Sequence, residues 1–158
     1  MKRFCGLTIV LAVAILASPI GWADEKNDLP EKELKAFEGN WQCKREEGGG
    51  RLTPEVIVSG FRLIIEGEKY QTIYGGKTKG SAANIIKLDP TATPKTIDVE
   101  WTSGSWKDQK QLGIYKLDGD KLEICWAEVG GKTRPKKFTT TPGVGAGNMY
   151  MKYVREKD

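Results

Sequence analysis

Residues 111–126 read QLGIYKLDGDKLEICW, two apolar-rich runs on either side of Asp118-Gly119-Asp120. An Asp-Gly pair between two such runs is typical of the tight turn of a β-hairpin. In the second run Leu122, Ile124 and Trp126 occupy every other position. A side-chain period of two is the pattern of a strand with one buried face. This stretch therefore predicts an antiparallel hairpin.

Similar patterns continue on both sides of this hairpin, separated by turn signals such as Gly67-Glu68 and Gly75-Gly76. The predicted strands cover residues 40–46, 60–66, 69–74, 78–88, 96–102, 111–118, 121–128 and 148–155. Strands that follow one another through hairpin connections favour an up-and-down antiparallel barrel. The fold class expected is therefore all-β, an eight-stranded up-and-down barrel.

A short helix is expected before the first strand. Pro30 and Glu31 suit the first turn of a helix. Leu34 and Phe37 are three residues apart, so both can face one surface, and Gly39 ends the helix.

The first 23 residues have the pattern of a secretory signal peptide. Lys2-Arg3 is basic, Leu7 to Ala17 is apolar, and small residues lead up to Ala23. The alternative is an uncleaved anchor, but the apolar run is broken by Pro19 and is short for a membrane span.

The predicted organisation is a signal peptide at 1–23, a polar N-terminal segment at 24–33 and a barrel domain at 34–158. We expect export to the periplasm or the cell exterior, with no stable membrane anchor after cleavage.

The composition excludes several kinds of chemistry. The 158 residues include no histidine, so there is no Ser-His-Asp triad, no Cys-His dyad and no His-ligated zinc. The 25 Lys and Arg residues are scattered against 21 Asp and Glu residues, which does not indicate a nucleic-acid surface. We therefore expect no enzyme, no catalytic residues, no metal and no cofactor.

Two cysteines, Cys43 and Cys125, remain after cleavage, and export permits a disulfide between them. The strand alternation argues against it. Cys43 shares the face of Trp41, whereas Cys125 points away from the face of Ile124 and Trp126. If both apolar faces point inward, the sulfurs lie on opposite sides of the barrel wall.

The predicted inner face carries the candidate ligand-lining residues, which are Phe61, Leu63, Val99, Trp101, Ile124 and Trp126. In a ligand-binding barrel these residues line an apolar cavity. In a filled barrel they form the core, and eight strands enclose enough room for either outcome.

Two polar groups have a functional and a structural interpretation. Asp98 and Glu100 share a strand face, either as an acid/base pair or as an outward polar face. Arg134 and Phe138 form a candidate anion or loop site. Alternatively, Phe138 plugs the barrel end while Arg134 pairs with a nearby carboxylate. Between the first two strands, residues 52–58 have the apolar side chains that a lid over the barrel mouth would need.

Gly39-Asn40-Trp41 resembles the Gly-x-Trp opening of lipocalins, in which a short helix leads into the first strand. In that family the Trp closes the bottom of the barrel, and an Arg near the end of the last strand packs over it. Arg155 is at the matching place. The resemblance implies that Gly39, Trp41 and Arg155 close one end of a lipocalin-like (calycin) barrel.

More of the chain resembles a small lipocalin-like domain of unknown function that is found in exported proteins of planctomycete bacteria. The matching pieces, in order over about residues 34–155, are Glu38 to Trp41, Leu88 to Pro90, Pro94 to Asp98, Gly113 to Asp120, Leu122 to Cys125, Arg134-Pro135, Phe138, Pro142-Gly143 and Val154-Arg155. The resemblance implies an eight-stranded barrel and no particular reaction.

Two non-enzymatic functions remain open at this point. In the first, the barrel binds a small apolar or amphipathic molecule. In the second, a packed barrel serves as a scaffold or an inhibitor-like module. It would bind another exported protein through its loops, with an exposed apolar patch around Trp106 and Val129.

Overall fold

The computed structural model describes residues 29–75, 78–142 and 147–157. The predicted signal peptide at 1–23 lies outside the described residues. The helices are α1 (Glu31–Phe37) and α2 (Glu55–Val58). The strands are β1 (Gly39–Gly48), β2 (Arg51–Leu52), β3 (Arg62–Glu66), β4 (Lys69–Tyr74), β5 (Thr78–Asp89), β6 (Lys95–Trp101), β7 (Lys110–Asp118), β8 (Lys121–Trp126) and β9 (Met149–Arg155).

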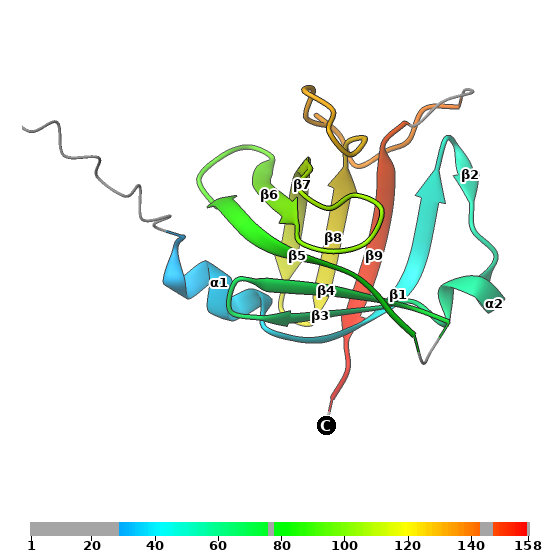
Figure 1. The fold of residues 1–158 in the computed structure, drawn as a ribbon, viewed down its shortest axis with the longest axis horizontal. Helices are drawn as coiled ribbons and strands as arrows, with labels where there is room; N and C mark the ends of the chain where they lie inside the picture. The colour runs from blue at the N-terminus through cyan, green and yellow to red at the C-terminus, as the bar shows by residue number, and fades with distance from the viewer. Residues whose placement is uncertain (1–28, 76–77, 143–146, 158) are drawn as a thin grey trace, which may run out of the picture.

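Eight antiparallel strands, β1 and β3 to β9, form a closed barrel (Figure 1). Each strand pairs with the next one along the chain, and β9 returns to pair with β1 from Trp41↔Arg155 to Gly48↔Met149. The predicted all-β, eight-stranded barrel is confirmed, and the predicted strand limits agree with the structure to within two residues at each end.

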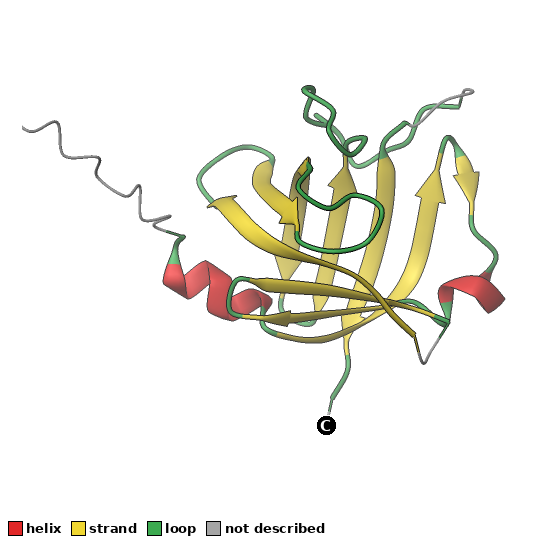
Figure 2. Ribbon diagram, viewed as in Figure 1, coloured by secondary structure: helices red, strands yellow, loops and turns green. Residues whose placement is uncertain are grey.

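The segment between β1 and β3 was not predicted as regular structure. Strand β2 pairs only with the outer end of β1, through Glu47↔Leu52 and Gly48↔Arg51, and the single turn of α2 follows it. These two elements form an excursion at the side of the barrel, away from α1 (Figure 2).

The β7–β8 hairpin forms as the sequence predicts. Leu117 pairs with Leu122, Asp118 pairs with Lys121, and Gly119 supplies a positive φ of 55° in the turn. A positive φ is costly for residues with a Cβ, which explains the glycine at this position.

The barrel interior near α1 is filled by side chains. The fully buried members are Phe37, Trp41, Leu63, Ile65, Ile85, Ile97, Val99, Leu122 and Ile124. Most are aliphatic residues from alternate strand positions, as expected for a strand with one buried face. A second, smaller cluster of Ile114, Cys125 and Tyr150 lies apart from this core, with Phe138 packed on it.

The three residues predicted to close the barrel lie together beside α1. The guanidinium carbon of Arg155 is 4.0 Å from the centroid of the Trp41 ring. Arg155 also donates hydrogen bonds to the carbonyls of Ala36, at 2.8 Å, and Glu38. Gly39 has a φ of +130°, and a Cβ there would lie 2.8 Å from Arg155 Nη1, so a side chain would displace the arginine.

Helix α1 is held to the barrel by a polar contact as well as by Phe37. Glu33 accepts hydrogen bonds from the Tyr115 hydroxyl at 2.7 Å and from Lys95 at 2.9 Å. Burial raises the pKa of the Glu33 carboxyl, but these two partners outweigh burial and leave the pKa below its usual value. The predicted domain boundary at Leu34 therefore falls inside a helix that packs on the barrel.

The two cysteines of the described residues, Cys43 and Cys125, are free thiols. Cys43 belongs to the main core, whereas Cys125 belongs to the separate outer cluster. Burial raises the pKa of Cys43 to about 12 and that of Cys125 to about 11, so both thiols remain protonated at neutral pH.

Neither described helix, α1 nor α2, has the length and the apolar composition of a membrane-spanning helix.

Arg155→Ala is expected to lower the free energy of unfolding by about 1–3 kcal/mol, because it removes a cation–π contact and two hydrogen bonds to backbone carbonyls. Urea denaturation measures the change. Arg45→Ala is the matched control, since Arg45 is half exposed and pairs only with Glu47, so its loss should cost less than about 1 kcal/mol. Equal losses for both variants would contradict the role of Arg155.

Candidate functional site

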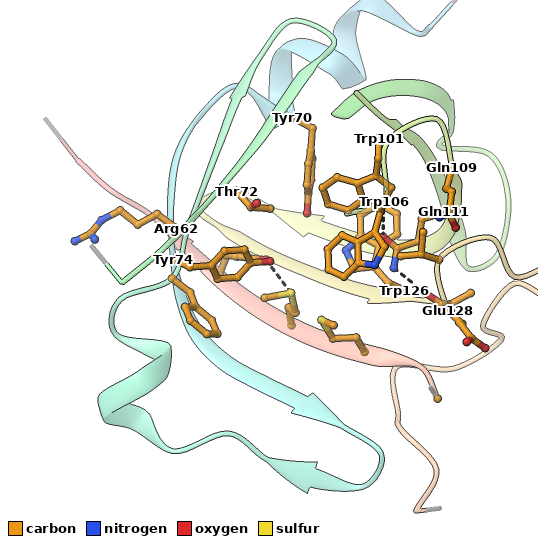
Figure 3. A pocket seen from close by; sticks show the side chains of 17 residues that line it. Arg62, Tyr70, Thr72, Tyr74, Trp101, Trp106, Gln109, Gln111, Trp126 and Glu128 are labelled. Atoms are coloured by element: carbon orange, nitrogen blue, oxygen red, sulfur yellow. Dashed lines mark hydrogen bonds between the residues drawn. The ribbon is translucent and has the colours of Figure 1, made fainter. Parts of the chain in front are cut away.

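A cavity of about 340 Å³ occupies the end of the barrel opposite α1 (Figure 3). It lies where β4, β6 and β8 end and where β3, β7 and β9 begin. Its lining is Phe61, Arg62, Tyr70, Thr72, Tyr74, Trp101, Trp106, Gln109, Gln111, Trp126, Ala127, Glu128, Val129, Gly147, Met149, Met151 and Tyr153.

Aromatic residues make up seven of the 17 residues in the cavity wall. The Tyr70 ring meets Trp101 and Trp126 at nearly right angles, with centroids 6.1 and 5.9 Å away. Trp106, in the loop between β6 and β7, leans on Trp101 with a centroid distance of 5.3 Å. These separations and angles are those of favourable edge-to-face contacts, which fix the orientation of the rings that line the cavity.

Glycines make room for two of these rings. A Cβ at Gly113 on β7 would lie 2.6 Å from the Trp126 ring, and a Cβ at Gly80 on β5 would lie 2.7 Å from the Tyr74 ring. Real Cβ atoms do not approach other atoms so closely, so each aromatic side chain lies across a neighbouring strand only because that strand has a glycine there.

Several polar groups of the wall are hydrogen-bonded within the protein. Gln111 accepts a bond from Trp101 Nε1 at 3.2 Å and donates one to the Ala127 carbonyl at 2.8 Å. The Tyr153 hydroxyl donates to the Met151 sulfur at 3.0 Å, and a thioether is a weak acceptor. Burial raises the pKa of Tyr70 and of Tyr153, so both hydroxyls stay neutral.

Two charged residues border the cavity. Arg62 pairs with Glu156 through a 3.1 Å contact, and its guanidinium points away from the aromatic side chains (Figure 3). Glu128 lies at the mouth, just beyond the end of β8, and makes no ion pair with any described residue.

A further carboxyl, Glu46, stands opposite Met151 in the β1–β9 pairing and is half-buried. Burial raises its pKa, and a hydrogen bond with the Thr53 side chain only partly opposes this.

The structure places three of the six predicted lining residues, Phe61, Trp101 and Trp126, on the cavity wall. Leu63, Val99 and Ile124 do not line the cavity. They share the inner face but lie one step deeper, where side chains from opposing strands meet and fill the barrel. Met149, Met151 and Tyr153, at alternate positions of β9, also line the cavity. They were not predicted, although their alternation in the sequence indicates a shared face.

The loops differ from expectation in two ways. Trp106 and Val129, predicted as a patch for a protein partner, both line the cavity mouth. In the predicted lid, by contrast, Leu52, Val56 and Ile57 are exposed and do not line the cavity.

Arg134 and Phe138 do not form an anion site. Arg134 binds both carboxylate oxygens of Asp98, at 2.5 and 3.0 Å, and donates to the carbonyls of Ile97 and Gly113. Its donors are therefore committed within the protein. The alternative is confirmed for Arg134, which pairs with the nearby carboxylate of Asp98, but not for Phe138, which packs beside Tyr150 in the outer cluster instead of plugging the barrel end.

Asp98 thus serves as the partner of Arg134 rather than as one half of an acid/base pair with Glu100. In the part of the chain that the structure describes, no group of acidic or cysteine side chains is arranged to hold a metal ion.

The closed meander of eight strands, the short helix at one end and the cavity at the other define a lipocalin-like β-barrel. Comparison with protein-family models, with curated proteins and with solved structures finds no match.

Asp98→Asn is expected to lower the free energy of unfolding by about 1–3 kcal/mol, because it leaves a partly buried guanidinium without its carboxylate. Glu100→Gln, two residues along the same strand, is the matched control and should change the value by no more than about 0.5 kcal/mol. Urea denaturation of both variants tests this, and a larger effect at Glu100 would contradict the assignment.

Glu46→Gln is expected to raise the free energy of unfolding at about pH 7 and to change it little at about pH 3. A carboxyl whose pKa is raised by folding holds its proton more tightly in the folded protein, so stability falls as the pH rises through that pKa. Denaturation at both pH values measures the effect. Glu55→Gln, at an exposed position on α2, is the control, and a loss of stability in Glu46→Gln near pH 7 would refute the assignment.

Proposed function

We propose that this chain is an exported, non-enzymatic lipocalin-like protein that binds one small apolar or amphipathic molecule in the barrel cavity. The observation that carries the proposal is the cavity of about 340 Å³, whose largely apolar wall includes seven aromatic residues. Ligand sites are commonly concave and apolar, with a few polar groups that orient the ligand.

The cavity volume bounds the size of the ligand. Binding sites for small molecules span roughly 300–1,000 Å³, so this cavity is at the small end of that range. An apolar cavity of about 150 Å³ holds benzene, so a molecule of two or three fused or linked rings fits here.

The chemistry of the wall favours binding over catalysis. Tyr70 and Tyr153 have raised pKa values and act as neutral hydroxyls, which makes them poor proton acceptors. Asp98, the buried carboxylate singled out from the sequence, is occupied by Arg134.

The N-terminal pattern of residues 1–23 supports export to the periplasm or the cell exterior. The resemblance to the small lipocalin-like domain of exported planctomycete proteins supports the same assignment. We include both in the proposal.

A second candidate function is the binding of another exported protein. It is favoured by one observation, the exposed apolar side chains of Leu52, Val56 and Ile57 on the β2–α2 excursion, of which Val56 is 82% exposed. Single exposed apolar residues are common, but a cluster of three on one short segment is typical of a contact surface.

N-Phenyl-1-naphthylamine is a neutral probe with a phenyl and a naphthyl ring system. It is expected to bind the mature protein and to quench its tryptophan fluorescence. Three of the five tryptophans, Trp101, Trp106 and Trp126, line the cavity. Val129→Trp, which adds a large side chain at the mouth, should weaken binding about tenfold or more, because the ligand loses space that it needs.

Val154→Trp is the matched control, since Val154 is on β9 but is not part of the cavity wall. This variant should bind the probe as the unmodified protein does. Binding that Val129→Trp leaves unchanged would place the probe elsewhere. Absence of any probe binding would favour the second candidate function.

A further inference from the structure

Two described residues that line the cavity are charged, Arg62 and Glu128. Glu128 is a carboxylate at the rim, and Glu46 stands across from Met151 on the adjoining wall. The nearest lining cation, Arg62, is directed away and is neutralised by Glu156. Arg134 is neutralised by Asp98, and Lys132 and Lys136 line a neighbouring surface depression that shares Ala127 and Glu128 with the cavity but not the tryptophans.

The aromatic rings of the wall also favour a positively charged ligand. The face of an aromatic ring carries a partial negative charge and attracts cations, most strongly for Trp. The cavity lining combines three Trp rings, Trp101, Trp106 and Trp126, with one acidic residue, Glu128. Trp106 is 36% exposed, so part of its indole remains open to a ligand.

The described lining offers no positive charge to an anionic ligand inside the cavity. Moving an ion into an apolar cavity costs several kcal/mol unless fixed charges or dipoles replace its hydration. Among the described lining residues, no cationic side chain points into the cavity, and a negative group would face the indole rings and Glu128.

We propose that the ligand is an amphipathic cation, an aromatic or aliphatic amine whose protonated or quaternary nitrogen lies among Trp101, Trp106 and Trp126 beside Glu128. This inference rests on the proposed function and names its ligand class. The apolar part of the ligand then extends inward against Met149 and Met151, whose flexible thioether side chains adapt to different shapes. The hydroxyl groups of Tyr70 and Tyr153 in the wall are neutral and supply no charge for the ligand.

Three probes of one shape test the charge preference. Phenyltrimethylammonium, tert-butylbenzene and benzenesulfonate each carry a phenyl ring and a compact group, with positive, neutral and negative charge in turn. Each is titrated against the mature protein loaded with N-phenyl-1-naphthylamine. The ammonium compound is expected to displace the naphthylamine at a concentration about tenfold lower than its neutral isostere, and benzenesulfonate should be the weakest. The neutral isostere loses less hydration on entering an apolar site, so only a specific attraction for the cation produces this order.

Two variants locate the attraction. Trp106→Leu keeps an apolar side chain but removes a π face, and it should raise the displacement midpoint of the ammonium compound about tenfold while leaving the neutral isostere nearly unchanged. Glu128→Gln should raise the ammonium midpoint about two- to fivefold, since an exposed charge pair contributes little. Glu66→Gln, at the other end of β3, is the control and should change neither.

The outcomes separate this inference from the function on which it rests. Displacement by tert-butylbenzene or benzenesulfonate at concentrations equal to or below that of the ammonium compound would overturn the cation preference and leave the binding function standing. Failure of the naphthylamine itself to bind would overturn both. Equal loss of all three probes in Trp106→Leu would assign that residue to shape rather than to charge, and it would likewise overturn the inference.

Discussion

The pairing of β1 with β9 is the contact on which the barrel depends, because it joins the first and last strands of the meander. An unclosed sheet would leave two strand edges with unpaired backbone groups. Trp41 and Arg155 stand opposite each other in this pairing. Because Arg155 also binds the carbonyls of Ala36 and Glu38, one side chain joins the first strand, the last strand and the end of α1. The residues that close the barrel therefore also seal one of its ends.

With that end sealed, the interior divides into two parts. Near α1, branched aliphatic side chains such as Ile65, Ile97 and Ile124 interdigitate and fill the space. At the other end the same inner faces carry Tyr70, Trp101 and Trp126, whose rings meet at steep angles and leave a cavity. The filled half fixes the strands around the open half, so the ligand site that we propose there is rigid, which lowers the entropy cost of binding.

The fold could be predicted from the sequence because strand alternation and Gly-containing turns are local signals. The β7–β8 hairpin follows from them, and so does the placement of Cys43 in the core and of Cys125 outside it. The cavity was predicted only in part, since alternation identifies the face of a residue but not its depth along the barrel. Leu63 therefore appeared equivalent to Phe61, although only Phe61 lines the cavity. Contacts made by loops have no periodic signal, so the bond between Arg134 and Asp98 required the structure.

We propose that the aromatic end of the barrel holds a small molecule when the protein is in its host. Native mass spectrometry of the mature protein, purified gently from its host, tests this claim most directly. The account predicts an added mass of one small molecule per chain, which is released under denaturing conditions and is lost in Val129→Trp but kept in Val154→Trp. A spectrum that shows only the mass of the bare chain in the unmodified protein would contradict the claim.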